Sequence, residues 1–228
     1  MSIRENYETI IGNIARAAES AGRNASDVQL IAVTKYVPVE RIAEVVACGA
    51  NAVGENRVQE LSDKLDFFNS NELDVHLIGQ LQTNKVKYVI GKVKLIQSVD
   101  RLALAETIDR LAGAADVVQD VLIEVNIGGE EQKGGVAVDE MSGFLRAISD
   151  MNNIRVKGLM CIPPAVGETE VRRHFERMRR LFEGISDCAI PNVSMEQLSM
   201  GMSGDYMSAI AEGATMVRVG TALFGART

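Results

Sequence analysis

Eight short apolar segments, rich in β-branched residues, alternate with helical segments along the chain, and this alternation constrains the fold more than any other feature. Helices that alternate with short buried strands form parallel β/α units, because each helix has to cover one face of the sheet. Eight such units predict a closed (β/α)8 TIM barrel, with a doubly wound open sheet as the alternative. The predicted strands are 28–33, 51–56, 75–79, 94–99, 121–126, 156–162, 195–200 and 215–220.

The segments between the predicted strands carry apolar residues at three- and four-residue steps, which is the spacing of an amphipathic helix. The clearest is 168–184, where Val171 and Phe175 share one face. An extra helix, 2–21, precedes the first strand. We expect residues 1–228 to form one domain, because no Gly-, Pro- or Ser-rich linker interrupts the alternation. The other predicted helices are 38–49, 57–67, 83–90, 101–113, 138–151 and 204–212.

The chain carries a net charge of −7, and its three cysteines are widely separated. A negative surface repels nucleic acid and anionic membranes, so neither is expected as a partner. Because the sequence has no CxxC pair, we expect no metal site and no disulfide framework. The N-terminal segment lacks the apolar stretch of a signal peptide, and no apolar run approaches the roughly 18 residues of a membrane helix. The expected location is the cytoplasm.

Polar and glycine residues follow most of the predicted strands, which is where ligands bind in a (β/α)8 barrel. Lys35 comes directly after the apolar segment LIAVT, so its amine is placed to point into the mouth of the barrel. A partly desolvated lysine amine is nucleophilic toward aldehydes. The alternative is a solvated lysine on a loop, because lysine is rarely buried.

Two glycine-containing segments, SMGMSGD (199–205) and RVGT (218–221), lie at the ends of the seventh and eighth predicted strands. Loops at these two places form the usual phosphate site of such barrels. Small residues let backbone N–H groups approach an anion, and Ser203 and Thr221 add hydroxyl donors. Two ordinary turns are the alternative. Arg218 lies within the last strand, where an unpaired guanidinium is costly, so it either faces a ligand or forms a structural ion pair.

Seven segments of the chain match the motifs of a known family in their order along the sequence. They are AVTKYVP (32–38), GENRVQE (54–60), HLIGQLQTNK (76–85), SVD (98–100), EVNIGGEEQKGG (124–135), GLMCIPP (158–164) and LSMGMSGDYMSAIAEGATMVRVGTALFG (198–225). Together they resemble the YggS/PROSC family, the pyridoxal phosphate homeostasis proteins. The resemblance runs from residue 30 nearly to the C-terminus.

This resemblance implies a barrel like the N-terminal domain of alanine racemase, the type III fold of proteins that bind pyridoxal 5′-phosphate (PLP). It implies that Lys35 holds PLP as a Schiff base, the internal aldimine, and that Arg218 faces the pyridine nitrogen. Ser203, Gly220 and Thr221 are implied to form the phosphate cradle. The other residues implied to lie at or near the cofactor are Asn56, Ser199, Met200 and Gly201.

The resemblance also implies a role in PLP homeostasis, in which the protein buffers the cofactor or delivers it to PLP-dependent apo-enzymes. We predict no catalytic residue and no strong turnover, because an arginine donates to the ring nitrogen without protonating it and so leaves a poor electron sink. Racemases of this fold add a β-domain. We expect none here, because the sequence ends at Thr228 soon after the eighth predicted strand, and we therefore expect an open site and a monomer.

Three other functions are weighed against this one. The chain is alternatively an amino-acid racemase with an unusual substrate, a Schiff-base aldolase in which Lys35 attacks the substrate directly, or a scaffold whose loops are only turns. His76 and His174 are interpreted as structural rather than catalytic. Whether Lys85 or Lys133 forms a transient second PLP site is left open.

Overall fold

Eight parallel strands close into one barrel in the computed structural model of this chain, which describes residues 2–130 and 132–225. The strands are β1 (Gln29–Val33), β2 (Ala52–Glu55), β3 (Asp74–Leu77), β4 (Leu95–Val99), β5 (Gln119–Glu124), β6 (Ile154–Met160), β7 (Val193–Ser199) and β8 (Met216–Val219). Each strand pairs with the next, and β8 pairs back with β1, so that Ile31 lies opposite Arg218. The predicted closed barrel is therefore confirmed, and the open sheet is wrong.

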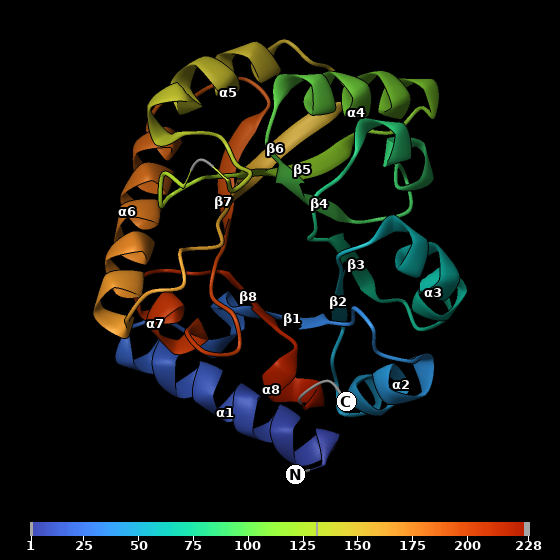
Figure 1. Ribbon diagram of the computed structural model, residues 1–228, viewed down its shortest axis with the longest axis vertical. Helices are drawn as coiled ribbons and strands as arrows, with labels where there is room; N and C mark the ends of the chain where they lie inside the picture. The colour runs from blue at the N-terminus through green and yellow to red at the C-terminus, as the bar shows by residue number, and fades with distance from the viewer. Residues whose placement is uncertain (1, 131, 226–228) are drawn as a thin grey trace.

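The helices surround the ring of strands (Figure 1). They are α1 (Ile3–Ser20), α2 (Val39–Ala47), α3 (Val58–Ser70), α4 (Leu102–Ala114), α5 (Met141–Ser149), α6 (Glu168–Ser186), α7 (Tyr206–Ala211) and α8 (Thr221–Phe224). Two short 3₁₀ helices, η1 (Ala25–Asp27) and η3 (Val138–Glu140), precede β1 and α5. The last helix, α8, is a single turn that the apolar spacing does not predict.

The short helix predicted at 83–90 is present, and it is the 3₁₀ helix η2 (Thr83–Tyr88) rather than an α-helix. Val86 and Val89 are both fully buried. A 3₁₀ helix has three residues per turn and places residues three apart on one side, so this tighter coil fits both side chains against the barrel. Gly91, with φ of 70°, then reverses the chain toward β4.

The extra helix α1 is confirmed, and it braces the part of the barrel that carries the glycine-containing loops. Ser2 caps it through a reciprocal pair of hydrogen bonds with Glu5, which satisfies two of the free N–H groups at a helix start. From the face of α1, Asn6 Nδ2 donates to the Leu223 carbonyl at 3.0 Å, and Asn13 Nδ2 donates to the Tyr206 hydroxyl at 2.8 Å. Both α7 and α8 are thereby tied to the N-terminal helix.

The apolar core has two parts, as expected for a barrel wrapped by helices. The larger lies between the strands and the helices, and the smaller fills part of the barrel interior. The members of the interior cluster are Ile31, Ala52, Leu95, Leu122, Met160 and Met216. The barrel interior also contains four buried polar side chains, His76, Gln97, Ser199 and Arg218, which hydrogen-bond to one another.

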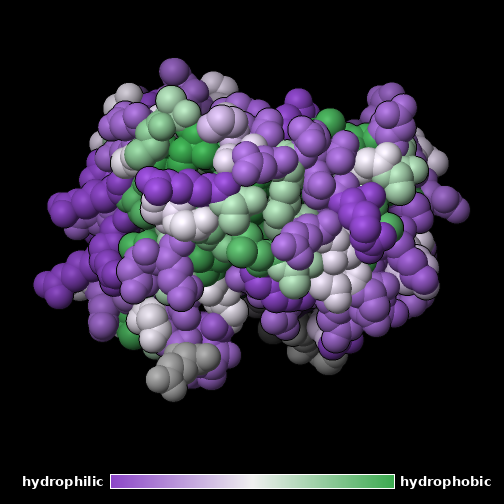
Figure 2. Space-filling model, turned by 90° about the horizontal axis from the view of Figure 1, so that it is seen from above, coloured by the Kyte–Doolittle hydropathy of each residue, from purple (hydrophilic) through white to green (hydrophobic). Residues whose placement is uncertain are grey.

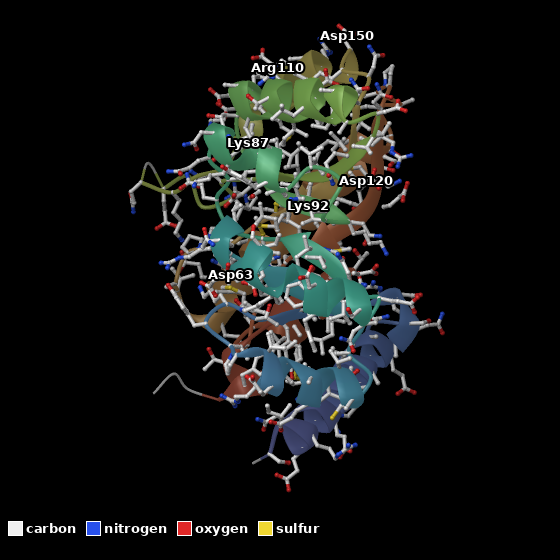
Figure 3. The ribbon with its side chains drawn as sticks, turned by 90° about the vertical axis from the view of Figure 1, so that its right-hand side faces the viewer. Asp63, Lys87, Lys92, Arg110, Asp120 and Asp150 are labelled. Atoms are coloured by element: carbon white, nitrogen blue, oxygen red, sulfur yellow. The ribbon has the colours of Figure 1, made fainter. Side chains whose placement is uncertain are left out.

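The outer surface is mainly hydrophilic. Figure 2 shows hydrophilic residues over most of one face, with hydrophobic ones gathered between them. Charged residues such as Asp63, Lys87 and Arg110 lie on the outside of the helical layer (Figure 3). Among the described residues, none of the helices combines the length and apolar character needed to cross a bilayer.

Candidate functional site

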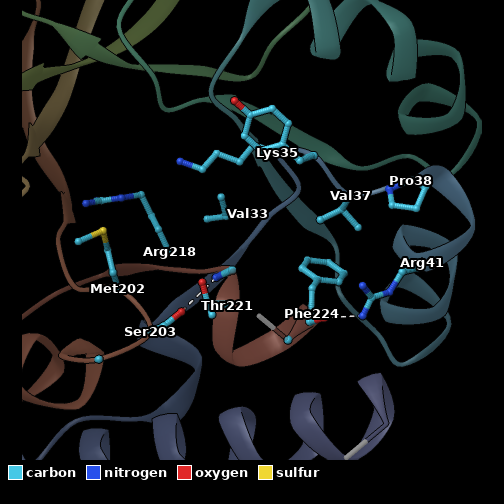
Figure 4. A pocket seen from close by; sticks show the side chains of 14 residues that line it. Val33, Lys35, Val37, Pro38, Arg41, Met202, Ser203, Arg218, Thr221 and Phe224 are labelled. Carbon is cyan, nitrogen blue, oxygen red and sulfur yellow. Dashed lines mark hydrogen bonds between the residues drawn. The ribbon is translucent and has the colours of Figure 1, made fainter. Parts of the chain in front are cut away.

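A cavity of about 810 Å³ opens beside the C-terminal ends of β1 and β8 (Figure 4). Its walls come from three segments far apart in the sequence: 33–41 after β1, 202–204 after β7 and 218–225 at the end of β8. This is the end of a (β/α)8 barrel at which ligands bind. The predicted site region therefore coincides with a real cavity.

Lys35 lines this cavity, half-buried, on the turn that follows β1. The next residue, Tyr36, has φ of 61°, a left-handed conformation that turns the chain sharply. Its backbone N–H donates to Glu60 Oε2 at 2.6 Å, and the Val37 N–H donates to the Thr34 carbonyl at 3.0 Å. No residue of the described chain accepts a hydrogen bond from the Lys35 amine or pairs with it. The amine is therefore available to a ligand.

A buried network of polar groups holds the backbone at the base of this turn. Glu55 at the end of β2 is fully buried, and its Oε1 accepts from Thr34 Oγ1 at 2.7 Å and from Lys64 Nζ at 2.8 Å. Lys64 also donates to the Thr34 carbonyl at 2.8 Å. Burial raises the pKa of Glu55, while the bonds from Lys64 and Thr34 lower it. The residue before Lys35 is thus fixed through both its side chain and its carbonyl.

Glu55 and Lys64 are not among the site residues predicted from the sequence. The available signal was the glutamate that ends the otherwise apolar segment AVGE, because a carboxylate in a buried strand requires a partner. Nothing in the sequence identified that partner, since Lys64 lies among charged helical residues that look solvated.

Arg218 reaches the cavity from β8, and the side chain is only 4% exposed. Nη1 donates to Ser199 Oγ at 2.6 Å and Nη2 to the Cys161 carbonyl at 2.9 Å. Burial lowers the pKa of Arg218. Within the described chain no carboxylate lies close enough for an ion pair, so an ion pair does not explain its burial. The two hydrogen bonds use two of its five N–H groups and leave others for the cavity.

The third wall of the cavity concentrates backbone N–H groups around the Ser203 hydroxyl. Ser203 Oγ accepts from the N–H of Gly220 at 3.4 Å (Figure 4). It also accepts from the N–H of Ala222 at 3.2 Å. Gly201 has φ of 92°, and a Cβ there would lie 2.6 Å from the Ala209 Cβ, so glycine is required in this loop. Converging N–H groups and hydroxyls make a suitable anion site.

The structure brings five of the nine predicted site residues to the cavity wall: Lys35, Ser203, Arg218, Gly220 and Thr221. Figure 4 shows the Lys35 and Arg218 side chains extending toward the same side of the cavity. Arg41, Met202 and Phe224 also line it and were not predicted. Arg41 donates to the Phe224 carbonyl and so ties α2 to α8.

The other four predicted site residues are not among those that line the cavity. Ser199 and Met200 are fully buried, and the Gly201 carbonyl accepts from the Arg218 N–H at 2.9 Å. Asn56 is half-buried, and its Oδ1 is buried without a hydrogen-bond partner. Contact of these four with a cofactor stays a prediction.

The two lysines left open as a second site have neighbours of their own. Lys133 borders a smaller cavity of about 180 Å³, where its amine binds Glu130 Oε2 at 2.6 Å and the Pro163 carbonyl at 3.3 Å. Lys85 lies over the Tyr88 ring, 5.6 Å from the ring centre. Neither lysine lines the larger cavity.

Known proteins resemble this chain over its whole length. The family model described as "Alanine racemase, N-terminal domain" matches residues 6–228. A protein of Aquifex aeolicus named pyridoxal phosphate homeostasis protein is 45% identical over 228 residues, which cover 100% of this chain and 99% of that protein.

Two solved structures share both sequence and fold with this chain. A protein of unknown function from Bifidobacterium adolescentis is 37% identical, with a TM-score of 0.92, over 97% of this chain and 94% of that chain. PipY of Synechococcus elongatus, solved with PLP bound, is 35% identical, with a TM-score of 0.81, over 93% of this chain and 100% of that one.

Proposed function

Because this chain belongs to the family of pyridoxal phosphate homeostasis proteins, which is built on the alanine racemase N-terminal domain, we propose that it binds PLP covalently through the Lys35 amine and serves PLP homeostasis. One observation carries the proposal. The unpartnered Lys35 amine shares a cavity with the buried Arg218 guanidinium and with the N–H groups gathered at Ser203.

The groups that line the cavity fit the three polar features of PLP. When bound, PLP supplies an aldehyde for an amine and an electron-withdrawing ring, and it carries a phosphate ester. Lys35 supplies the amine. The hydroxyls of Ser203 and Thr221 supply donors for the phosphate, and Ser203 Oγ is held in place by the N–H groups of Gly220 and Ala222. Arg218 supplies a donor for the ring nitrogen.

The same groups favour holding PLP over transforming a substrate on it. No carboxylate or imidazole is found among the described residues that line the cavity. Proton transfer in this site would fall to Lys35 and Tyr36, the lining side chains that can act as an acid or a base. Arg218 can donate a hydrogen bond to a ring nitrogen and gives up no proton. We infer a carrier that releases PLP to apo-enzymes and acts as a monomer.

Reduction and peptide mapping test the covalent site. After incubation with PLP and treatment with borohydride, mass spectrometry of peptides is expected to find the adduct on Lys35. Lys35→Ala should lose both the adduct and the yellow colour of the protein, whereas Lys85→Ala, which removes an exposed lysine, should keep both. An adduct that persists in Lys35→Ala at the wild-type level would refute the assignment.

The family-model match to alanine racemase keeps an amino-acid racemase as the second candidate. A racemisation assay over a panel of free amino acids separates the two functions. Turnover that depends on Lys35 and on PLP would favour the racemase, and its absence from the whole panel would favour the carrier.

A further inference from the structure

Four buried polar side chains form a continuous chain across the barrel interior and end at Arg218. Arg218 Nη1 donates to Ser199 Oγ at 2.6 Å, and Ser199 Oγ donates to Gln97 Oε1 at 2.6 Å. The Gln97 amide nitrogen then lies 2.9 Å from His76 Nδ1. These four hydrogen-bonded side chains come from β8, β7, β4 and β3, and none of them is more than 4% exposed.

Packing alone does not account for these residues. The interior of a (β/α)8 barrel is ordinarily filled by branched apolar side chains, and Ile31, Leu95 and Leu122 are such residues in this interior. Buried polar groups are costly unless they are fully hydrogen-bonded, and His76 Nε2 has no partner within the described chain. These polar residues lower the stability of the fold, so their presence in the barrel interior points to a role other than packing.

Because the Gln97 amide oxygen faces Ser199 and its nitrogen faces His76, the hydrogen bonds between these four side chains run in one direction. A guanidinium has no acceptor, so Ser199 Oγ must accept from Arg218 and direct its own hydrogen to Gln97 Oε1. The Gln97 amide nitrogen must then donate to His76 Nδ1, which places the imidazole hydrogen on Nε2. Burial lowers the pKa of His76 to about 4, so at neutral pH the ring remains the neutral acceptor that this arrangement requires.

We propose that Gln97 and His76 are positioning residues that, through Ser199, hold the Arg218 guanidinium in the orientation that presents its free N–H groups to the cofactor cavity. The inference rests on the proposed function, because it assigns Arg218 to the ring nitrogen of PLP. The Cys161 carbonyl fixes Nη2, and the chain from His76 fixes Nη1. Two fixed nitrogens set the plane of the guanidinium.

Replacing Gln97 with methionine separates this role from a structural one. Gln97→Met keeps the length of the side chain and removes its hydrogen bonds to Ser199 and His76, together with a long contact to the Met216 sulfur. Gln119→Met is the matched control: Gln119 is also a buried strand glutamine, 3% exposed, but it bonds to the backbone of Gly91, Val93 and Asp120 and has no link to Arg218.

The first measurement needs no PLP. In ¹⁵N NMR of the full chain, the Arg218 side-chain N–H groups are expected to exchange with solvent about tenfold faster in Gln97→Met, the factor that corresponds to 1.4 kcal/mol. The His76 Nδ1 signal should also move away from its hydrogen-bonded position. Gln119→Met should match the wild type in both respects.

The second measurement uses the PLP-loaded protein. Gln97→Met is expected to weaken PLP binding about tenfold and to shift the visible absorption band, because the donor to the ring nitrogen is no longer held in place. If Gln97→Met does not fold, as judged by circular dichroism, Ser199→Ala breaks the same chain by removing only a hydroxyl and should give the same two changes.

Wild-type exchange and wild-type affinity in Gln97→Met, or equal changes in Gln119→Met, would overturn the positioning role. Failure of the wild-type chain itself to bind PLP would overturn the proposed function. The two failures can be distinguished, because the NMR comparison of Arg218 between Gln97→Met and the wild type is made without PLP. It therefore tests the positioning role even if the wild-type chain does not bind PLP.

Discussion

Glu124 ends β5 at the mouth of the barrel, and its carboxyl group has an unusual affinity for protons. Burial, together with the nearby charge of Asp100, raises the pKa of Glu124 from an ordinary value of 4.5 to about 7, although Arg218 acts in the opposite direction. The perturbation that exposes this effect is Glu124→Gln, which closely resembles the protonated carboxylic acid and cannot ionise.

The sign of the effect follows from proton binding in the two states. Between pH 4.5 and about 7 the folded chain keeps a proton on Glu124 that the unfolded chain releases, so stability falls as the pH rises through this window. The difference between the two pKa values corresponds to about 3 kcal/mol. Glu124→Gln should therefore match the wild type near pH 4.5 and exceed its stability by up to about 3 kcal/mol near pH 8.

Urea unfolding followed by circular dichroism, repeated across this pH range, measures the difference. Subtracting the wild-type curve from the variant curve cancels every other titrating group, so the difference isolates Glu124. Glu196→Gln is a control whose effect on stability should have the opposite sign. The hydrogen bond from Lys157 lowers the pKa of the half-exposed Glu196 carboxyl, so removing this carboxylate should lower the stability of the fold slightly at neutral pH. A difference that stays flat for Glu124→Gln would refute the reasoning.

Two further predictions concern backbone packing and thiol reactivity. Gly158→Ala should destabilise the fold by more than about 3 kcal/mol in urea unfolding, because φ is 147° and a Cβ would lie 1.8 Å from the Gln197 carbonyl oxygen. Gly143→Ala, at an open position within α5, should instead stabilise it by about 0.5–1 kcal/mol, and equal effects of the two changes would contradict the packing argument. Exposed Cys188 should react quickly with a thiol reagent, whereas fully buried Cys161, whose pKa burial raises to about 12, should be labelled only in denaturant. Mass spectrometry distinguishes the two cysteines, and fast labelling of Cys161 in the native protein would contradict this prediction.

The barrel could be predicted from the sequence because its signal is local. Each strand is a short apolar segment and each helix repeats its apolar residues along one face, so each of the eight β/α units can be recognised without its neighbours. The segment 83–90 shows the limit of this reasoning. Its apolar residues suit either an α-helix or a 3₁₀ helix, and the choice depends on how Val86 and Val89 meet the barrel.

The site was predictable where strand order alone determines position. Lys35, Ser203 and Thr221 follow the first, seventh and eighth strands, and closing the barrel brings the eighth strand beside the first. Partners that lie inside the barrel could not be found in this way. Alternation along a strand shows which side chains point into the barrel. It does not show which of them are neighbours there, because this depends on how the strands are staggered relative to one another. Gln97 and Ser199, for example, are hydrogen-bonded but lie 102 positions apart in the sequence.

Lys35 and Arg218, the two cationic residues of the cavity that are assigned to PLP in the proposed function, differ in how they are held, and this difference bears on what the site can do. Arg218 is fixed through its own side chain by Ser199 and Cys161. Lys35 is fixed only through its backbone neighbours, since Glu55 and Lys64 hold Thr34 and leave the amine free. Under the proposed function, a fixed donor for the ring nitrogen and an unpartnered amine for the aldehyde suit a site that captures PLP and also releases it. Preorganisation lowers the entropic cost of binding, so rigidity at Arg218 favours affinity, whereas freedom at Lys35 favours exchange.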